Sequence, residues 1–331
     1  MKIRPVARRG AIAVALVTIA SAALTACGSS DDTTADGLTK ITVSYSEKVA
    51  DYLPLWTAVD EGYFKQQGLD VKLVNLASDK GFPALISGQV DIAAIGGTQI
   101  VSGKAAGADV KILAAATPVL PFELYADVAS ASELKGKKVG YTSKSGSQYV
   151  GTIQAIKAAG LKPSDVDLVP LGDVSNVNSA LLSGTIDAAA SHPPATVKFE
   201  DAGLHDVVDL AKEATPYMNV SYSAMSPYIK GHADVLDKFF AALKQSTDLV
   251  LSDEAKSTKI LGDYLGEDDQ AALNDAWKFY TSEVIKKVPL AEPDQLKLSV
   301  ESLEGSVQGV DNVDLNGLID STFVKKAFGV A

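Results

Sequence analysis

Arginine, cysteine and histidine are scarce in this 331-residue sequence, and each shortage excludes a class of function. The only arginines are Arg4, Arg8 and Arg9, so the rest of the chain lacks the planar guanidinium fork that holds carboxylates or sulfonates by two bonds. The three histidines are far apart, no H-E-x-x-H pattern occurs, and only one cysteine is present. The sequence therefore predicts no catalytic residue, no metal site and no cofactor.

The start of the chain has the layout of a secretory signal. Basic residues precede an apolar stretch, residues 11–23, that is shorter than the ~20 residues a transmembrane helix needs. The next four residues, Leu24-Thr25-Ala26-Cys27, are similar to the lipobox of bacterial lipoproteins. Residues 1–26 are thus expected to be a signal peptide, Cys27 the attachment point of a lipid anchor, and residues 27–37 a flexible polar tether.

Acidic side chains outnumber basic ones along the chain. The net charge is −11, and removing residues 1–26 takes away four basic and no acidic side chains. Such an anionic body excludes nucleic acid as a partner. No later apolar run is long enough to cross a membrane. We therefore expect a monomer at the outer face of the cytoplasmic membrane, held there by its lipid.

Two segments 96 positions apart repeat each other, ALISGQVDIAAIGG at residues 84–97 and ALLSGTIDAAASHP at residues 180–193. The flanks extend the match, because the V-x-Y of residues 43–45 recurs at residues 139–141. This period is much longer than the ~20 to 50 residues of solenoid repeats. The repeat indicates two related lobes.

Each copy alternates β-branched runs with helical stretches, which is typical of βαβ units. A helix is expected over residues 54–67, and long amphipathic helices are expected after residue 227. Asp91 and Asp187, at two strand entrances, are expected to form turns rather than to catalyse a reaction. The predicted fold is α/β and two-lobed, each lobe a mostly parallel sheet flanked by helices, with lobe 1 at residues 38–127 plus 226–331 and lobe 2 at residues 128–225.

Longer stretches, among them YLPLWTAVDEGYFKQQGLDVKLV and ASELKGKKVGYTSKSGSQY, resemble the solute-binding proteins of bacterial ABC importers over residues 41–225. The branch that is most similar includes sulfonate, taurine and nitrate receptors and binders of thiamine-pyrimidine precursors. The resemblance implies a periplasmic-binding-protein-like receptor rather than an enzyme. It would close on a small-molecule solute and deliver it to the transmembrane subunits of an ABC permease. A pyrimidine-synthase-like enzyme and a structural lipoprotein are the alternatives.

Ligands of open α/β sheets bind outside the carboxyl ends of the strands, and this rule selects four loops here. The loop at residues 143–147 combines free amides at a helix start with several hydroxyls, which favours an anion, although its serines also suit plain helix capping. The expected ligand-binding residues are Tyr45, Ser46, Tyr52, Gly97, Thr98, Gln99, Ser143, Lys144, Ser145, Gly146, Ser147 and His192.

Two classes of solute remain open from the sequence. Helix N-termini together with Lys144 would suit a sulfonate or a carboxylate. An uncharged heteroaromatic such as a pyrimidine, held by Tyr45 and Tyr52, is the other class.

Overall fold

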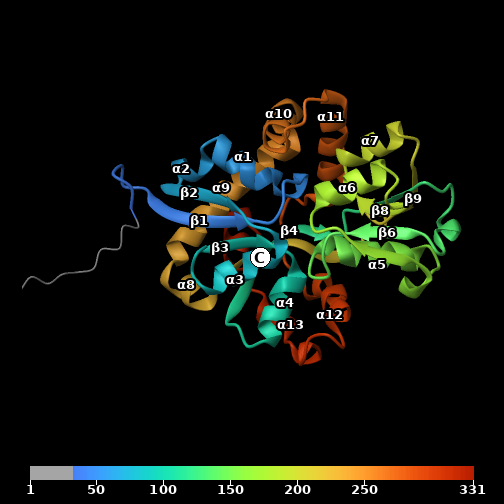
Figure 1. The fold of residues 1–331 in the computed structure, drawn as a ribbon. Helices are drawn as coiled ribbons and strands as arrows, with labels where there is room; N and C mark the ends of the chain where they lie inside the picture. The colour runs from blue at the N-terminus through green and yellow to red at the C-terminus, as the bar shows by residue number, and fades with distance from the viewer. Residues whose placement is uncertain (1–32) are drawn as a thin grey trace, which may run out of the picture. The chain divides into compact units, whose positions relative to one another are not determined.

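The computed structural model describes residues 33–331. The predicted signal peptide, the lipid-attachment residue Cys27 and the first part of the tether lie outside the described residues. Two five-stranded sheets form the centre of the described chain (Figure 1). The first sheet has the order β2 (Leu69–Asn75), β1 (Thr39–Tyr45), β3 (Ile92–Ile95), β10 (Pro216–Met225) and β4 (Val110–Val119). The second has the order β7 (Asp167–Pro170), β6 (Lys138–Tyr141), β8 (Ala188–Ser191), β5 (Glu123–Ala126) and β9 (His205–Asp209).

The pairing of the strands confirms the internal repeat. In the first sheet β1 and β3 run parallel with Val43 beside Ile92, and in the second β6 and β8 run parallel with Val139 beside Ala188. Both partners are shifted by the same 96 positions that separate the repeated segments. The two sheets therefore share one pattern of strand order and register.

The repeated aspartates close the entrances of the third parallel strands. The Asp91 carboxylate accepts a hydrogen bond from the Thr42 N–H at 2.7 Å, and the Asp187 carboxylate accepts the equivalent bond from the Lys138 N–H at 2.7 Å. Their backbone N–H groups return bonds to the same residues at 2.9 Å. Both aspartates therefore have a structural role, although their bonds join neighbouring strands rather than close a turn as predicted.

Each sheet is mixed, and its antiparallel strand comes from an unexpected part of the chain. β10 runs antiparallel to β3 and β4, and β5 runs antiparallel to β8 and β9. The predicted lobe boundaries place β5 with the first sheet and β10 with the second, and both placements are wrong. The crossings lie at residues 120–122 and 210–215, because each of these strands completes the sheet on the far side of its crossing.

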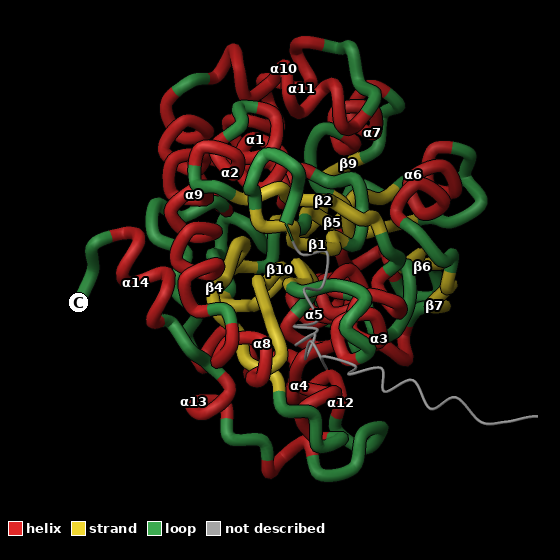
Figure 2. Tube along the Cα trace, turned by 90° about the vertical axis from the view of Figure 1, so that its left-hand side faces the viewer, coloured by secondary structure: helices red, strands yellow, loops and turns green. Residues whose placement is uncertain are grey.

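Helices cover both faces of each sheet, as Figures 1 and 2 show. On β3 the side chains alternate between two apolar clusters, Ile92 and Ala94 in one and Ala93 and Ile95 in the other. The C-terminal helices mostly pack on the first sheet, as predicted, and α12 also touches α5. The helices are α1 (Leu53–Asp60), α2 (Tyr63–Gln66), α3 (Ser78–Ile86), α4 (Gly97–Ala105), α5 (Ser147–Ala158), α6 (Val174–Leu182), α7 (Ala195–Asp201), α8 (Ser226–Gly231), α9 (Ala233–Ser252), α10 (Glu254–Leu265), α11 (Gln270–Phe279), α12 (Lys297–Leu303), α13 (Leu315–Leu318) and α14 (Thr322–Phe328).

The helix predicted over residues 54–67 is broken into α1 and α2. Gly62, between them, has φ of 71°, a left-handed conformation that glycine adopts without a steric penalty. Among the described residues, no helix combines the length and apolar character that a membrane crossing requires.

Replacing Asp91 by alanine should lower the free energy of unfolding by about 1–3 kcal/mol, because a partly buried N–H loses its charged acceptor. Asp91→Asn keeps an acceptor oxygen and should lose less. Asp187→Ala should also lose less, because its bond to Lys138 is exposed and water can replace it. Urea unfolding followed by circular dichroism measures all three; equal losses for the two alanine variants would contradict the assignment.

Candidate functional site

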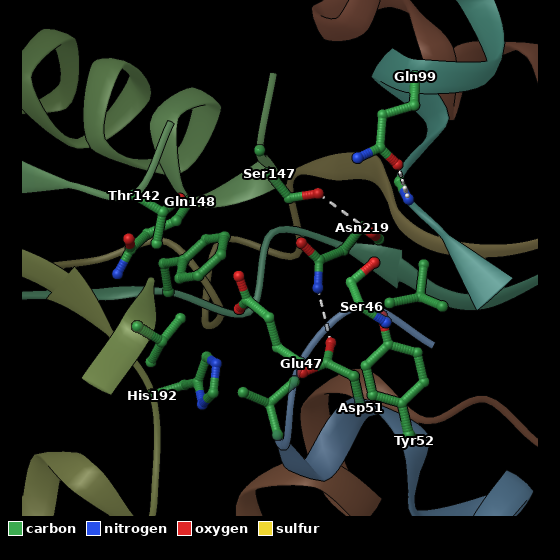
Figure 3. Close-up of a pocket in the computed structure, with 16 residues that line it drawn as sticks. Ser46, Glu47, Asp51, Tyr52, Gln99, Thr142, Ser147, Gln148, His192 and Asn219 are labelled. Carbon is green, nitrogen blue, oxygen red and sulfur yellow. Dashed lines mark hydrogen bonds between the residues drawn. The ribbon is translucent and has the colours of Figure 1, made fainter. Parts of the chain in front are cut away.

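A small cavity lies where the carboxyl ends of the parallel strands of both sheets meet (Figure 3). Its volume is about 50 Å³, which is room for about three to five water molecules. The first lobe contributes loop residues after β1 and β3 and two residues of β10, and the second contributes loop residues after β6 and β8 and the start of α5. The lining consists of Ser46, Glu47, Val49, Asp51, Tyr52, Gly96, Gln99, Phe122, Thr142, Gly146, Ser147, Gln148, Val174, His192, Asn219 and Val220.

Half of the residues predicted from the sequence line this cavity, namely Ser46, Tyr52, Gln99, Gly146, Ser147 and His192. Two of these six also have structural roles. The Tyr52 hydroxyl accepts from the Ser46 N–H at 3.2 Å and donates to the Ala94 carbonyl at 3.3 Å. The Gln99 side-chain oxygen accepts from the Gly96 N–H at 3.1 Å and so caps the start of α4.

The structure places the other six predicted residues outside the lining. Tyr45 is buried beside Tyr52, their ring centroids 5.4 Å apart. Thr98 is buried, and its hydroxyl is 3.0 Å from the hydroxyls of Tyr217 and Ser299. Gly97 is packed so closely that an added Cβ would stand 2.7 Å from a Leu296 methyl. The lining also lacks Ser143, Lys144 and Ser145. The two serine hydroxyls bond each other at 3.2 Å, and Lys144 is exposed.

Asn219 and Gln148 were not predicted, although both line the cavity. Asn219 lies on β10, the strand whose sheet the sequence does not reveal, so no strand-end rule selects it. Gln148 directly follows the loop at residues 143–147. The strand-end rule selects this part of the chain, but it does not predict which side chains line the cavity. Glu47, Asp51 and Phe122 also line the cavity and are not among the predicted residues.

Asp51 is the most buried charged residue of the lining, with 1% of its surface exposed. Its carboxylate accepts hydrogen bonds from the Asn219 side-chain amide at 2.6 Å and from the Tyr280 hydroxyl at 2.8 Å. Burial, with the Asp51 charge adding to it, raises the pKa of Tyr280 well above its usual value, so this hydroxyl stays protonated and donates. Both partners of Asp51 are neutral groups.

Two of the lining residues, Gln148 and Asn219, carry a buried amide oxygen that has no hydrogen-bond partner. In Figure 3 the Asn219 amide oxygen points into the space that the lining residues surround. The orientation of each amide is fixed by its nitrogen: Gln148 Nε2 donates to the Ala190 carbonyl at 2.7 Å, and Asn219 Nδ2 donates to Asp51. Turning either amide over would set two oxygens against each other, so these bonds fix which atom of each amide is the unpartnered oxygen. Each is an acceptor that is ready for an N–H or O–H group.

Aromatic rings close one side of the cavity. The His192 ring lies 5.8 Å from that of Phe122, and it meets the edge of the Tyr280 ring at 5.8 Å. A second hollow, of about 350 Å³, shares Val49, Val174 and His192 with the cavity. These three side chains therefore separate the inner cavity from a wider outer space.

The two lobes touch around the cavity through a few polar contacts. The Ser147 hydroxyl at the start of α5 donates to the Asn219 carbonyl at 3.1 Å. At the outer hollow, Lys198 of α7 pairs with Glu267 at 2.5 Å, and this pairing lowers the pKa of Glu267. Gly96 approaches the second lobe so closely that an added Cβ would stand 2.8 Å from the Ser147 hydroxyl oxygen.

Glu123 lies near the cavity in a cluster with two other carboxylates, Asp206 and Asp209. Burial, reinforced by these two neighbours, raises the pKa of Glu123 to about 8. Lys212 pairs with Asp209 at 2.6 Å and opposes this effect only in part. Glu123 is therefore largely protonated at neutral pH.

Comparisons with known proteins agree with this architecture. The model of the NMT1/THI5-like family matches residues 49–257, more than half of the chain. YtlA of Bacillus subtilis, a presumed binding protein, is 26% identical over 307 residues, which cover 87% of this chain and 90% of YtlA.

One further sequence relative is named as an enzyme, and one solved structure of similar fold is named as a binding protein. The 4-amino-5-hydroxymethyl-2-methylpyrimidine phosphate synthase THI13 of Saccharomyces cerevisiae is 28% identical over 233 residues, 63% of this chain and 66%, just under two thirds, of the synthase. The periplasmic aliphatic sulphonate binding protein SsuA of Escherichia coli superposes with a TM-score of 0.66 and 18% identity, covering 87% of this chain and 91% of SsuA. The predicted two-lobed fold and the predicted group of relatives are confirmed.

The pKa of Glu123 predicts how stability depends on pH. The folded chain binds this proton more tightly than the unfolded chain, whose glutamate has the usual pKa of 4.5. The stabilisation is therefore complete below pH 4.5 and is lost as the pH rises through 8, by at most about 1.4 kcal/mol per pH unit. Glu123→Gln should remove this part of the decline between pH 5.5 and 8.5, as measured by urea unfolding; parallel curves for both proteins would contradict it.

Proposed function

Because this chain belongs to the NMT1/THI5-like family, we propose that it is the solute-binding receptor of an ABC importer. The observation that carries the proposal is the cavity, which is built from strand-end loops of two related lobes and is too small and too enclosed for a macromolecule. Such a receptor binds its solute between the lobes and is stabilised in the closed arrangement by it.

The position in the cell follows from the sequence. The predicted signal peptide and Cys27 support a lipid anchor at the outer face of the cytoplasmic membrane. From there the closed receptor would deliver its solute to the transmembrane subunits of the permease.

The lining supports one of the two solute classes that the sequence leaves open. Lys144, the expected partner of an anion, is exposed and lies outside the cavity. Tyr52, Phe122 and His192 instead offer aromatic surface to a small ring. A pyrimidine-like heteroaromatic therefore fits better than a sulfonate, taurine, nitrate or a carboxylate.

The similarity to the yeast synthases favours a second candidate, the synthesis of a pyrimidine. His192 is the only histidine of the described lining, since His205 lies on β9 and His232 lies between α8 and α9. Incubation of the purified protein with a bound solute, followed by mass spectrometry, separates the two functions. A receptor returns the solute unchanged, whereas steady formation of a new product would favour the synthase.

Ser147→Ala should weaken solute binding about tenfold or less, because one hydroxyl of the lining and its bond to Asn219 are lost. Ser145→Ala is the matched comparison, since Ser145 lies in the same loop but outside the lining. The solute is first found by thermal-shift screening of sulfonates, nitrate, carboxylates and pyrimidines, and calorimetry then measures both variants. Equal losses of affinity for the two variants would contradict the cavity as the binding site and favour the loop at residues 143–147.

Gly96→Val should hold the lobes apart, because its side chain would stand where Ser147 and Asn219 now meet Gly96. We expect a larger radius of gyration in small-angle X-ray scattering and an affinity at least about tenfold weaker, roughly 1.4 kcal/mol. Gly231→Val is the control, since a Cβ there meets nothing within 4 Å. An unchanged radius together with unchanged affinity would rule out closure at this contact.

A further inference from the structure

The lining of the cavity is acidic. Glu47 and Asp51 carry carboxylates, and among the described residues that line the cavity there is no lysine or arginine. Figure 3 shows the Glu47 carboxylate between the side of the cavity that holds Gln148 and the side that holds Asn219. An anion brought into this space would meet two like charges at short range.

Asp51 has the environment of a carboxylate that lacks its countercharge. It is almost fully buried, and both hydrogen bonds that it accepts come from neutral donors. A buried charge is costly unless an opposite charge and several hydrogen bonds compensate it. A cation in the cavity would supply the charge.

The amide oxygens of Gln148 and Asn219 point to a ligand independently of these charges. Only 5% of Gln148 and 7% of Asn219 is exposed, and neither oxygen has a partner. A buried acceptor without a donor costs about 1–3 kcal/mol, and water or a ligand must satisfy it. Since both amide nitrogens are already engaged, the ligand has to bring N–H or O–H donors.

We propose that the cavity selects a small organic cation that carries N–H donors, an ammonium or amidinium compound no larger than one ring. The inference rests on the proposed receptor function, and it assigns a positive charge to a solute that the sequence alone predicts to be either an anion or an uncharged heteroaromatic. Asp51 and Glu47 supply the opposite charge, while Gln148 and Asn219 orient the donors from opposite lobes. The aromatic rings of Phe122 and His192 then cover the apolar part of the ligand.

Two isosteric series test the charge alone, with calorimetry as the readout. The first is acetamidine, acetamide and acetate, and the second is benzamidine, benzamide and benzoate. At pH 7 the members of each series are a cation, a neutral molecule and an anion of nearly equal shape. We expect the cation to bind at least about tenfold more tightly than the amide, roughly 1.4 kcal/mol, and the anion to bind least.

Variants of the lining test the assignment to residues. Asp51→Asn and Glu47→Gln should each reduce the preference for the cation over the amide by about tenfold, with folding checked by thermal unfolding. Asp311→Asn, an exposed aspartate with the same change in charge, is the matched control and should leave the preference unchanged. If Asp51→Asn fails to fold, Glu47→Gln still decides the outcome.

The results separate this inference from the receptor function. Tighter binding of an anion, or no preference within either series, or no binding of any member at millimolar concentration, overturns the inference. An anion that binds and decreases the radius of gyration would leave the receptor function standing. A cation that binds without any decrease would support the charge assignment and count against the receptor function.

Discussion

The hydrogen bond from the Asn219 amide to the Asp51 carboxylate is the constraint on which the cavity depends. It joins β10 to the turn that precedes α1, and it fixes the amide so that Oδ1 faces the cavity. The carbonyl of the same residue accepts from Ser147 of the other lobe. Asn219 therefore bonds a buried carboxylate, carries an unpartnered acceptor oxygen and contacts the opposite lobe.

The polar contacts that join the lobes around the cavity are weak, and this suits the proposed receptor, which would open and close. The Ser147 hydrogen bond contributes about 1 kcal/mol and the partly exposed pair of Lys198 and Glu267 at most about 1 kcal/mol. Such small terms leave the two arrangements close in free energy, so that a ligand with a modest preference for the closed arrangement shifts the population. The outer hollow adjoins the cavity at Val49, Val174 and His192.

The parallel strands and the repeat could be predicted because each depends on local pattern. β1, β3, β6 and β8 have alternating or continuous apolar runs, and Asp91 and Asp187 mark the entrances of β3 and β8. Half of the predicted site residues line the cavity, because the strand-end rule names loops and not side chains. Tyr45 and Thr98 lie in such loops or beside them, but both side chains turn into buried contacts, Tyr45 with Trp56 and Thr98 with the distant Tyr217 and Ser299.

The sequence by itself determined the two related lobes, their three parallel strands with a common register, and the loops that face each other between them. Apolar periodicity is a property of neighbouring residues, and a repeat at a constant offset is visible in the sequence itself. Neither requires knowledge of the fold. Only the tertiary structure decided that β5 and β10 change sheets, that Lys144 stays outside, and that Asp51 meets Asn219. These outcomes depend on pairing between segments as far apart as 168 positions, where the choice of partner is made by packing and buried hydrogen bonds rather than by local pattern.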